Sequence, residues 1–364
     1  MLKMMVGLLC SFLVVCSCLL KAEQTLISTT SFRLIEVDRG YLAADYQYFS
    51  ESLHVFDFAS KIDSTFRPEE AKSRNISLAY RIMPNVLVSY RIERSSGSTS
   101  RDREPFLLES DVEGDSILIQ WEAGEFLDYS TLLYGGYSQR EQAPLNIPCY
   151  QYGTFTVGDC DAADFTFTNA ETGVADPALI TRADEDRWTI GLSFSKLLSS
   201  NWNIQHSIRF QSSDVSATVE SSFLSIDDPF LLAFQLNGEP LGTLIDRLRS
   251  SFPQSSPWKE RALRYDLGLN WAFSDQWLLS SSLGYLRVYR NGYLEADGIR
   301  EFESNMMLSA SLHYAPSPSM MLFLRGEVTK NYLLGIDPML YNQRTRKFFD
   351  YPFGQISAGL MIAF

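Results

Sequence analysis

The side chains that most often do chemistry are few in this chain and widely spaced. The three histidines are His54, His206 and His313, and no GxSxG motif presents a nucleophilic serine. Ser207 would point to the opposite face of an extended strand from His206, and position 208 is Ile. A hydrolase using His206 is therefore the least favoured function class, and three scattered histidines do not make a zinc site. We expect no catalytic residue, no metal and no cofactor.

Cysteine usage points to an oxidising compartment. Cys10, Cys16 and Cys18 lie in the apolar N-terminal stretch "MMVGLLCSFLVVCSCLL", which leaves Cys149 and Cys160 in the rest of the chain. Two cysteines separated by a short polar loop predict a disulfide in an exported protein. The acidic run "DCDAAD" around Cys160 lacks the glycine and the terminal glutamate of an EF-hand loop, so we interpret it as solvated acids.

Residues 1–22 have the pattern of a cleaved secretory signal peptide. Lys3 gives a positive start, an apolar core follows, and Ala22 precedes Glu23 at the expected cleavage point. An N-terminal anchor helix and a lipidated Cys18 are the alternatives. Cleavage would remove two lysines and no acid, which takes the formal net charge from −13 to about −15. Such an acidic chain is a poor nucleic-acid binder, because phosphate binding requires clustered Lys and Arg.

Apolar and polar residues alternate in many stretches of the chain, and this period of two predicts β-strands. In "ALRYDLGLNWAF" (262–273), the apolar side chains from Leu263 to Phe273 share one face, whereas Arg264, Asp266 and Asn270 share the other. The chain stops on the equally regular "FGQISAGLMIAF" (353–364). We count about twelve such strands, an even number as single-chain membrane barrels require.

The connections between these strands alternate strictly between short and long. A membrane barrel sorts its connections in this way, with short turns at one rim and long loops at the other, whereas a soluble β-sandwich has no reason to do so. The short connections are 83–85, 124–128, 198–201, 274–276 and 316–319, and the long ones are 50–72, 95–114, 140–185, 213–260, 291–300 and 332–351.

A secretory signal, alternating strands, sorted connections and a terminal Phe364 together resemble the bacterial outer-membrane β-barrel class, although they do not identify a family. The resemblance implies an all-β, transmembrane, antiparallel up-and-down barrel in the outer membrane, with short periplasmic turns and long external loops. Residues 23–40 would be a periplasmic segment and 41–364 a single barrel domain. Phe364 would belong to the assembly signal read by the barrel-assembly machinery, and outer-membrane lipid would surround the wall.

The charged residues on the polar face of the strands are the candidate lumen-lining residues. Acids and bases are nearly balanced among them, which predicts weak ion selectivity in a pore, or cross-lumen pairs that simply hold the wall together. The candidates are Asp45, Arg81, Arg91, Glu93, Glu122, Arg209, Arg264, Asp266, Arg325 and Glu327.

The long loop 213–260 is unusually apolar, and Leu241, Leu244, Ile245 and Leu248 recur at helical spacing. It either folds back over or into the lumen as a constriction, or packs against neighbouring loops. Taken together, the sequence favours a narrow channel or transporter for small solutes. A structural or adhesive surface barrel without a pore is the alternative.

Overall fold

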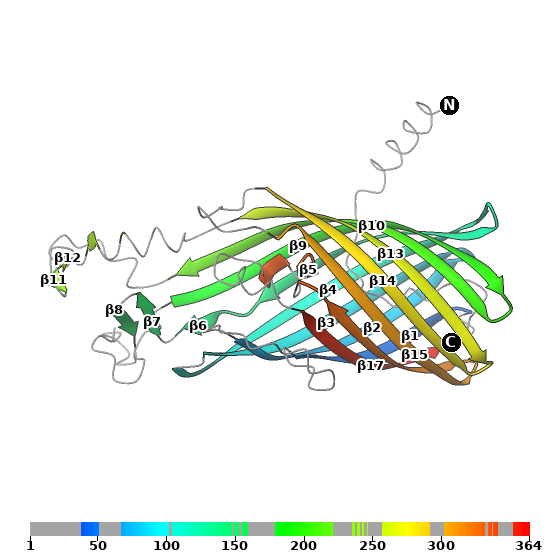
Figure 1. Ribbon diagram of the computed structural model, residues 1–364, viewed down its shortest axis with the longest axis horizontal. Helices are drawn as coiled ribbons and strands as arrows, with labels where there is room; N and C mark the ends of the chain where they lie inside the picture. Colours follow the sequence, from blue (N-terminus) through cyan, green and yellow to red (C-terminus); the bar gives the residue numbers. More distant parts are fainter. Residues whose placement is uncertain are drawn as a thin grey trace, which may run out of the picture.

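A closed antiparallel β-barrel forms the body of the protein (Figure 1). The computed structural model describes residues 38–50, 67–101, 104–147, 149–152, 155–158, 179–220, 235–236, 239–240, 242–243, 246, 257–291, 302–331, 334–336, 338–340 and 352–364. Within these residues, twelve strands pair in chain order around the wall. This confirms the all-β barrel predicted from the alternating pattern.

The wall strands are β1 (Gly40–Ser50), β2 (Arg67–Met83), β3 (Val86–Arg101), β4 (Glu104–Phe126), β5 (Tyr129–Gln142), β9 (Leu179–Ser199), β10 (Trp202–Glu220), β13 (Trp258–Ser274), β14 (Trp277–Asn291), β15 (Ser304–Ser317), β16 (Met320–Thr329) and β17 (Phe353–Ala363). The connections contain β6 (Leu145–Ile147), β7 (Cys149–Tyr152), β8 (Phe155–Gly158), β11 (Gln235–Leu236), β12 (Glu239–Pro240) and the 3-10 helix η2 (Pro338–Leu340). Among the described residues, no helix has the length and apolarity to cross a membrane.

The first and last strands close the barrel. Ala363 of β17 lies opposite Tyr41 of β1. The Phe364 amide donates to the Gly40 carbonyl at 2.9 Å, and the Phe364 carbonyl accepts from the Gly40 amide at 3.0 Å. The C-terminal residue is therefore part of the last rung of the ladder. An open sheet edge cannot be left in lipid, so these bonds complete the wall.

Tight two-residue turns join the strands at one rim, which we call the short-turn rim. They are 84–85, 127–128, 200–201, 275–276 and 318–319. Leu127 and Asp128 both have positive φ (52° and 64°), as a type I′ hairpin turn requires. Arg81 Nη1 donates to the Pro84 carbonyl at 2.6 Å and so braces the first of these turns. Gly40 and Phe364 lie at the same rim (Figure 1).

The outer face carries a band of exposed apolar side chains. On β13 this band runs over 263–273, with Leu263, Leu267 and Trp271 among its exposed members. Lys259 and Arg261 take the next outward positions toward the long-loop rim. A tilted strand of about 9–11 residues spans the apolar layer of a bilayer, so the length of the band fits a membrane.

Aromatic rings form a continuous row on the outer face along the short-turn rim. Trp202 and Trp271 stack with ring centroids 5.4 Å apart. Trp271 then contacts Phe273 at 5.3 Å, Phe273 contacts Trp277 at 6.1 Å, and Trp277 stacks on Tyr314 at 4.5 Å. Amphipathic rings favour the depth of the lipid headgroups, so this row marks one edge of the apolar layer.

Several strands extend further toward the long-loop rim than the sequence predicted. The expected long connection 95–114 is largely strand, because Arg101 pairs with Glu104 at the tip of a β3–β4 hairpin. β5 continues to Gln142, β9 already begins at Leu179, and β10 continues to Glu220. Beyond the apolar band the outward residues are polar, so the alternation of apolar residues ends while strand pairing continues.

Other sequence predictions concern residues outside the described ranges. The signal peptide 1–22, nearly all of 23–40, most of loop 213–260 and Cys160 fall there. The disulfide between Cys149 and Cys160 and the inward folding of loop 213–260 therefore stay predictions.

The described part of the connection between β16 and β17 lies inside the barrel. Leu334 is 0% exposed and packs on inward side chains that include Leu286 and Val288. Met339 of η2 packs on the inward side chains of Val215 and Trp258. We call residues 334–336 and 338–340 the inserted segment. It lies inside the long-loop half of the barrel, although the sequence suggested that 332–351 is an external loop.

Candidate functional site

Hydroxyl and amide side chains dominate the inner face between β9 and β15. Asn203 Nδ2 donates to Ser195 Oγ at 2.7 Å, and Gln205 Nε2 donates to Ser193 Oγ at 2.9 Å. These bonds run between neighbouring strands and hold the polar groups along the wall. Other members of this surface are Ser207, Asn270, Ser280, Ser282, Ser309 and Ser311. Water can wet such a surface, because each group can exchange a wall partner for a water molecule.

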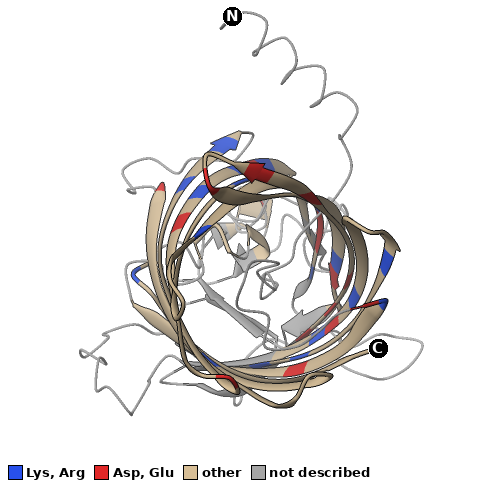
Figure 2. Ribbon diagram, turned by 90° about the vertical axis from the view of Figure 1, so that its right-hand side faces the viewer, with Lys and Arg blue, Asp and Glu red and all other residues tan. Residues whose placement is uncertain are grey.

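The predicted lumen residues occupy strand positions that alternate with the outward apolar residues, and the structure brings most of them together in pairs. Charged residues are distributed all around the wall (Figure 2). Asp45 accepts hydrogen bonds from Asn75 Nδ2 at 2.8 Å and Gln47 Nε2 at 3.2 Å. The ion pairs within the predicted set are Arg81–Glu122 at 3.6 Å, Arg209–Asp266 at 4.0 Å, Arg264–Asp266 at 2.8 Å and Arg325–Glu327 at 2.5 Å. That these residues line a path for solutes stays a prediction.

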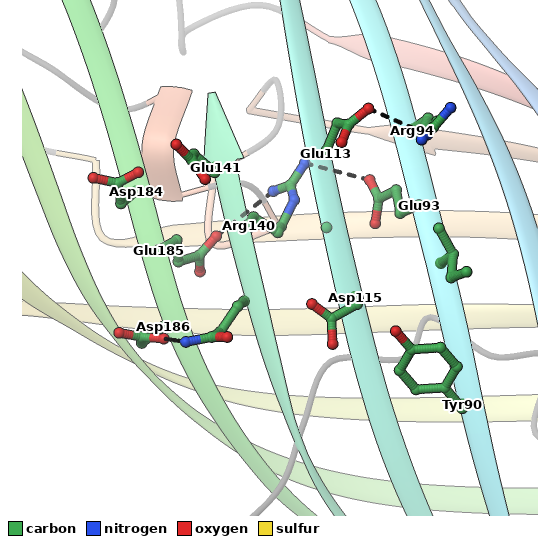
Figure 3. Close-up of a pocket in the computed structure, with 13 residues that line it drawn as sticks. Tyr90, Glu93, Arg94, Glu113, Asp115, Arg140, Glu141, Asp184, Glu185 and Asp186 are labelled. Atoms are coloured by element: carbon green, nitrogen blue, oxygen red, sulfur yellow. Dashed lines mark hydrogen bonds and ion pairs between the residues drawn. The ribbon is translucent and has the colours of Figure 1, made fainter. Parts of the chain in front are cut away.

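A second group of charged residues lines part of the inner wall near the long-loop rim. Arg140 lies between Glu93, at 3.4 Å, and Glu185, at 3.6 Å, and it links β3 to β9 through β5 (Figure 3). Glu185 also binds Arg187 at 2.5 Å. On the neighbouring strands, Glu260 of β13 pairs with Arg290 of β14 at 2.8 Å. We call Glu93, Arg140, Glu185, Arg187, Glu260 and Arg290 the mouth network.

Arg187 of the mouth network and Asn305 of β15 donate hydrogen bonds to backbone carbonyls in and next to the inserted segment. Arg187 Nη1 donates to the Ile336 carbonyl at 3.1 Å. Nearby, Asn305 Nδ2 donates to the Asn331 carbonyl at 3.1 Å and to the Leu334 carbonyl at 3.2 Å. These bonds satisfy carbonyl groups that a buried loop would otherwise leave without partners, at a free-energy cost. The inserted segment is therefore fixed to the wall by both polar and apolar contacts.

Sequence reasoning missed most of the mouth network. Arg140, Glu185 and Glu260 lie in stretches that the sequence predicts as long loops, although each keeps the inward parity of its strand. Glu185 and Arg187, for example, have the same parity as Gly191 and Ser193, which face inward. These residues could be predicted by extending the alternation of inward positions beyond the apolar band.

Burial affects one carboxyl of the mouth network in particular. Glu260 lies beyond the apolar band 263–273 on the long-loop side, and its side chain is 2% exposed. Desolvation raises the pKa of Glu260, and the neighbouring guanidinium of Arg290 opposes that rise. The wall therefore holds this charge at a free-energy cost, which an ion pair in a buried place only partly offsets.

The two described histidines occupy opposite faces of the wall. His206 Nδ1 lies 2.8 Å from the Tyr265 hydroxyl on the outer face, and its ring packs edge-on against Tyr129 at 6.2 Å. Its neighbour is therefore a phenol and not a serine. His313 is buried on the inner face, with Nε2 2.8 Å from Ser311 Oγ. Within the described ranges, no group of three or more His, Cys, Asp or Glu residues is placed to hold a metal ion.

A hollow of about 500 Å³ lies at the long-loop ends of β3, β4, β5 and β9 (Figure 3). Glu93, Arg140 and Glu185 of the mouth network line it, together with carboxylates of the outer face such as Asp115 and Asp186. The hollow is strongly acidic, and we assign it no ligand.

A closed sheet with an apolar outer band, a polar inner face and an aromatic row at one rim defines a transmembrane barrel of the outer-membrane class. Each wall strand pairs with a neighbour on both sides, which is the arrangement that lets strands cross lipid. The chain is thus an outer-membrane β-barrel.

No family model matches the chain, and no curated protein matches its sequence. Among solved structures, it is similar to the β domain of the Bordetella autotransporter BrkA, with a TM-score of 0.49, 9% identity, and coverage of 90% of this chain and 100% of that one. It is also similar to the transport unit of the autotransporter AIDA-I from Escherichia coli, with a TM-score of 0.48, 6% identity, and coverage of 98% and 97%. For the NanC porin, the TM-score is 0.41 and the identity 9%, over 89% of this chain and 100% of that one. The class assignment depends on this chain's own barrel, and these similarities add no function to it.

Proposed function

We propose that this barrel is a narrow channel for small solutes across the outer membrane, with weak ion selectivity. The observation that carries the proposal is the inner face, where hydroxyl and amide groups alternate with arginine–carboxylate pairs of nearly balanced sign. A pore lined by one sign of charge selects ions strongly, whereas a balanced wall does not. The proposal includes no catalytic residue and no cofactor.

The narrow width follows from two features. Twelve strands enclose more space than a side-chain-filled eight-stranded barrel and less than an open sixteen-stranded porin. The inserted segment then occupies part of the long-loop half, where Leu334 and Met339 pack on the wall. We infer that solutes pass beside this segment, and that it sets the conductance.

Conductance in planar bilayers tests the proposal. The wild-type barrel should form small pores with weak ion selectivity. The double variant Leu334→Asp, Met339→Asp should conduct more, because neither carboxylate can stay in the apolar sites that these side chains fill. Deleting residues 226–250 examines the other candidate constriction, which the sequence suggested. Both variants must first show the heat-dependent gel shift of a folded barrel.

The same inserted segment favours a second candidate, a structural or adhesive barrel without a pore. In that case the mouth network and the inserted segment would serve to fill the interior and stiffen the wall. Folded barrels that never conduct, with or without either segment, would select this alternative. In both cases we propose that Phe364 is read by the barrel-assembly machinery.

A further inference from the structure

A small cavity lies on the inner wall near the short-turn rim, where β16, β17, β1, β2 and β3 run side by side. Its volume is about 40 Å³, and the inward side chains of Arg91, Arg325, Asp45, Gln47 and Ser77 are part of its lining. A cavity needs a volume of roughly 10–15 Å³ to hold one water molecule, so this cavity has room for a small polar group.

Arg91 of β3 differs from the other inward arginines of the described strands in one respect, the absence of a carboxylate partner among the described residues. Its Nε is buried and has no hydrogen-bond partner. Within the described residues, no carboxylate pairs with its guanidinium, whereas each of the other inward arginines has one. Those pairs are Arg81–Glu122, Arg140–Glu93, Arg187–Glu185, Arg209–Asp266, Arg264–Asp266, Arg290–Glu260 and Arg325–Glu327.

Asp45 supplies the opposite charge in the same cavity. Its two described side-chain donors, Asn75 Nδ2 and Gln47 Nε2, are neutral amides, so they leave its charge uncompensated. Arg325, which also lines the cavity, is paired with Glu327 at 2.5 Å. Arg91 and Asp45 therefore present a positive and a negative group to one space without forming an ion pair with each other.

We propose that this cavity binds the carboxylate group of a small solute, with Arg91 as the binding residue. The planar guanidinium presents two parallel N–H donors that match a carboxylate, and a partly desolvated site strengthens the attraction. Asp45 gives preference to solutes that also carry an ammonium group, because a zwitterion complements both charges. This inference names a solute class for the proposed channel. Passage of the solute rests on the proposed channel function, whereas binding of the solute does not.

Binding to the purified, folded barrel in detergent tests the site, with acetate, glycine and methylammonium as probes and saturation-transfer NMR as the readout. Acetate and glycine should bind with dissociation constants of about a millimolar, which stays within the ceiling for ligands of so few atoms. Methylammonium alone should not bind. Arg91→Gln should weaken acetate and glycine binding by about tenfold or more, and Arg91→Lys by less, because an ammonium keeps the charge but not the paired donors.

Arg94→Gln is the matched control, since Arg94 lies on the same strand but faces outward with its side chain 72% exposed. Binding to this variant should equal that of the wild type. If glycine binds more tightly than acetate and Asp45→Asn removes this difference, the preferred solute is a zwitterion. If the two probes bind equally, the preferred solute is a simple carboxylate. Absence of binding to the folded wild type, or equal binding by Arg91→Gln and Arg94→Gln, overturns the site. A barrel that binds carboxylates but never conducts contradicts the channel alone, and one that conducts without binding contradicts this site alone.

Discussion

Gly191 lies directly beneath the ring of Tyr134, its partner across the β5–β9 ladder. A Cβ added to Gly191 would collide with that ring, whose hydroxyl reaches on to Ser207 of β10 at 3.3 Å. Phe323 lies in the same way over Gly359, across the β16–β17 ladder. Each ring therefore follows the wall instead of crossing the interior.

The substitutions Gly191→Ala and Gly359→Ala should push these rings away from the wall. We expect a lower single-channel conductance and a loss of about 1–3 kcal/mol in the free energy of unfolding, as for an overpacked interior. Gly326→Ala is the control, because nothing lies within 4 Å of a Cβ added there. Unchanged conductance and stability in both test variants would contradict this account of the glycines.

Removing Phe364, or changing it to Asp, should reduce the amount of folded barrel in the membrane. Removal deletes the bonds of Phe364 to Gly40, and either change deletes a ring that lies close to Gly40. The heat-dependent gel shift measures the folded fraction after expression. Phe364→Tyr keeps the ring and should assemble normally. Wild-type levels of folded barrel after the deletion would argue against an assembly role.

The pH dependence of stability should report the burial of Glu260. Its pKa is raised above the ordinary value of 4.5, so the folded state binds this proton more tightly than the unfolded state does. The contribution of Glu260 to the free energy of unfolding is thus complete below pH 4.5 and is lost as pH rises through the folded pKa.

We therefore compare the thermal unfolding midpoints of the wild type and Glu260→Gln. The wild-type midpoint minus the variant midpoint should increase as the pH falls from about 8 to about 5. Glu113→Gln is the control, since that side chain is 69% exposed and faces outward. If the difference between the thermal unfolding midpoints of wild type and Glu260→Gln is the same at both pH values, the raised pKa is refuted.

The Cys149–Cys160 pair should be oxidised in protein taken from the cell envelope. Closing so short a loop should contribute about 2–3 kcal/mol in the chain-entropy model. Thiol labelling of denatured, unreduced protein measures this directly. Two labelled cysteines per chain would show that the disulfide does not form.

The wall of the barrel could be predicted from the sequence because lipid imposes a strict period of two. Each strand must show apolar residues to the membrane, so the outward apolar positions continue to Phe364, although the inward Met361 and Ala363 join an apolar cluster. Beyond the band this constraint ends, which is why the sequence predicts a loop where Arg101 and Glu104 pair in the β3–β4 hairpin. The sequence therefore predicts that the strands exist, but it does not predict how long they are.

Side-chain partners were much less predictable than strand faces. The alternation places Arg187 on the inner face, but nothing in it indicates that Ile336, 149 positions away, supplies the acceptor. Leu334, Ile336 and Met339 follow no regular period, so their burial inside the barrel left no signal in the sequence. The unpaired state of Arg91 depends on the geometry of five strands, and only the folded barrel shows it.

Arginine is the basic residue of the inner wall, whereas the described lysines, Lys72, Lys196, Lys259 and Lys330, lie on the outside of the barrel or at its rims. Amine-reactive reagents should therefore label these four lysines without touching the described inner wall, which makes attachment through them compatible with transport measurements. Guanidinium groups also stay charged at any pH that leaves the barrel folded. Any change in ion preference on acidification must then come from the carboxylates or from His313, and in both cases its direction is toward anions.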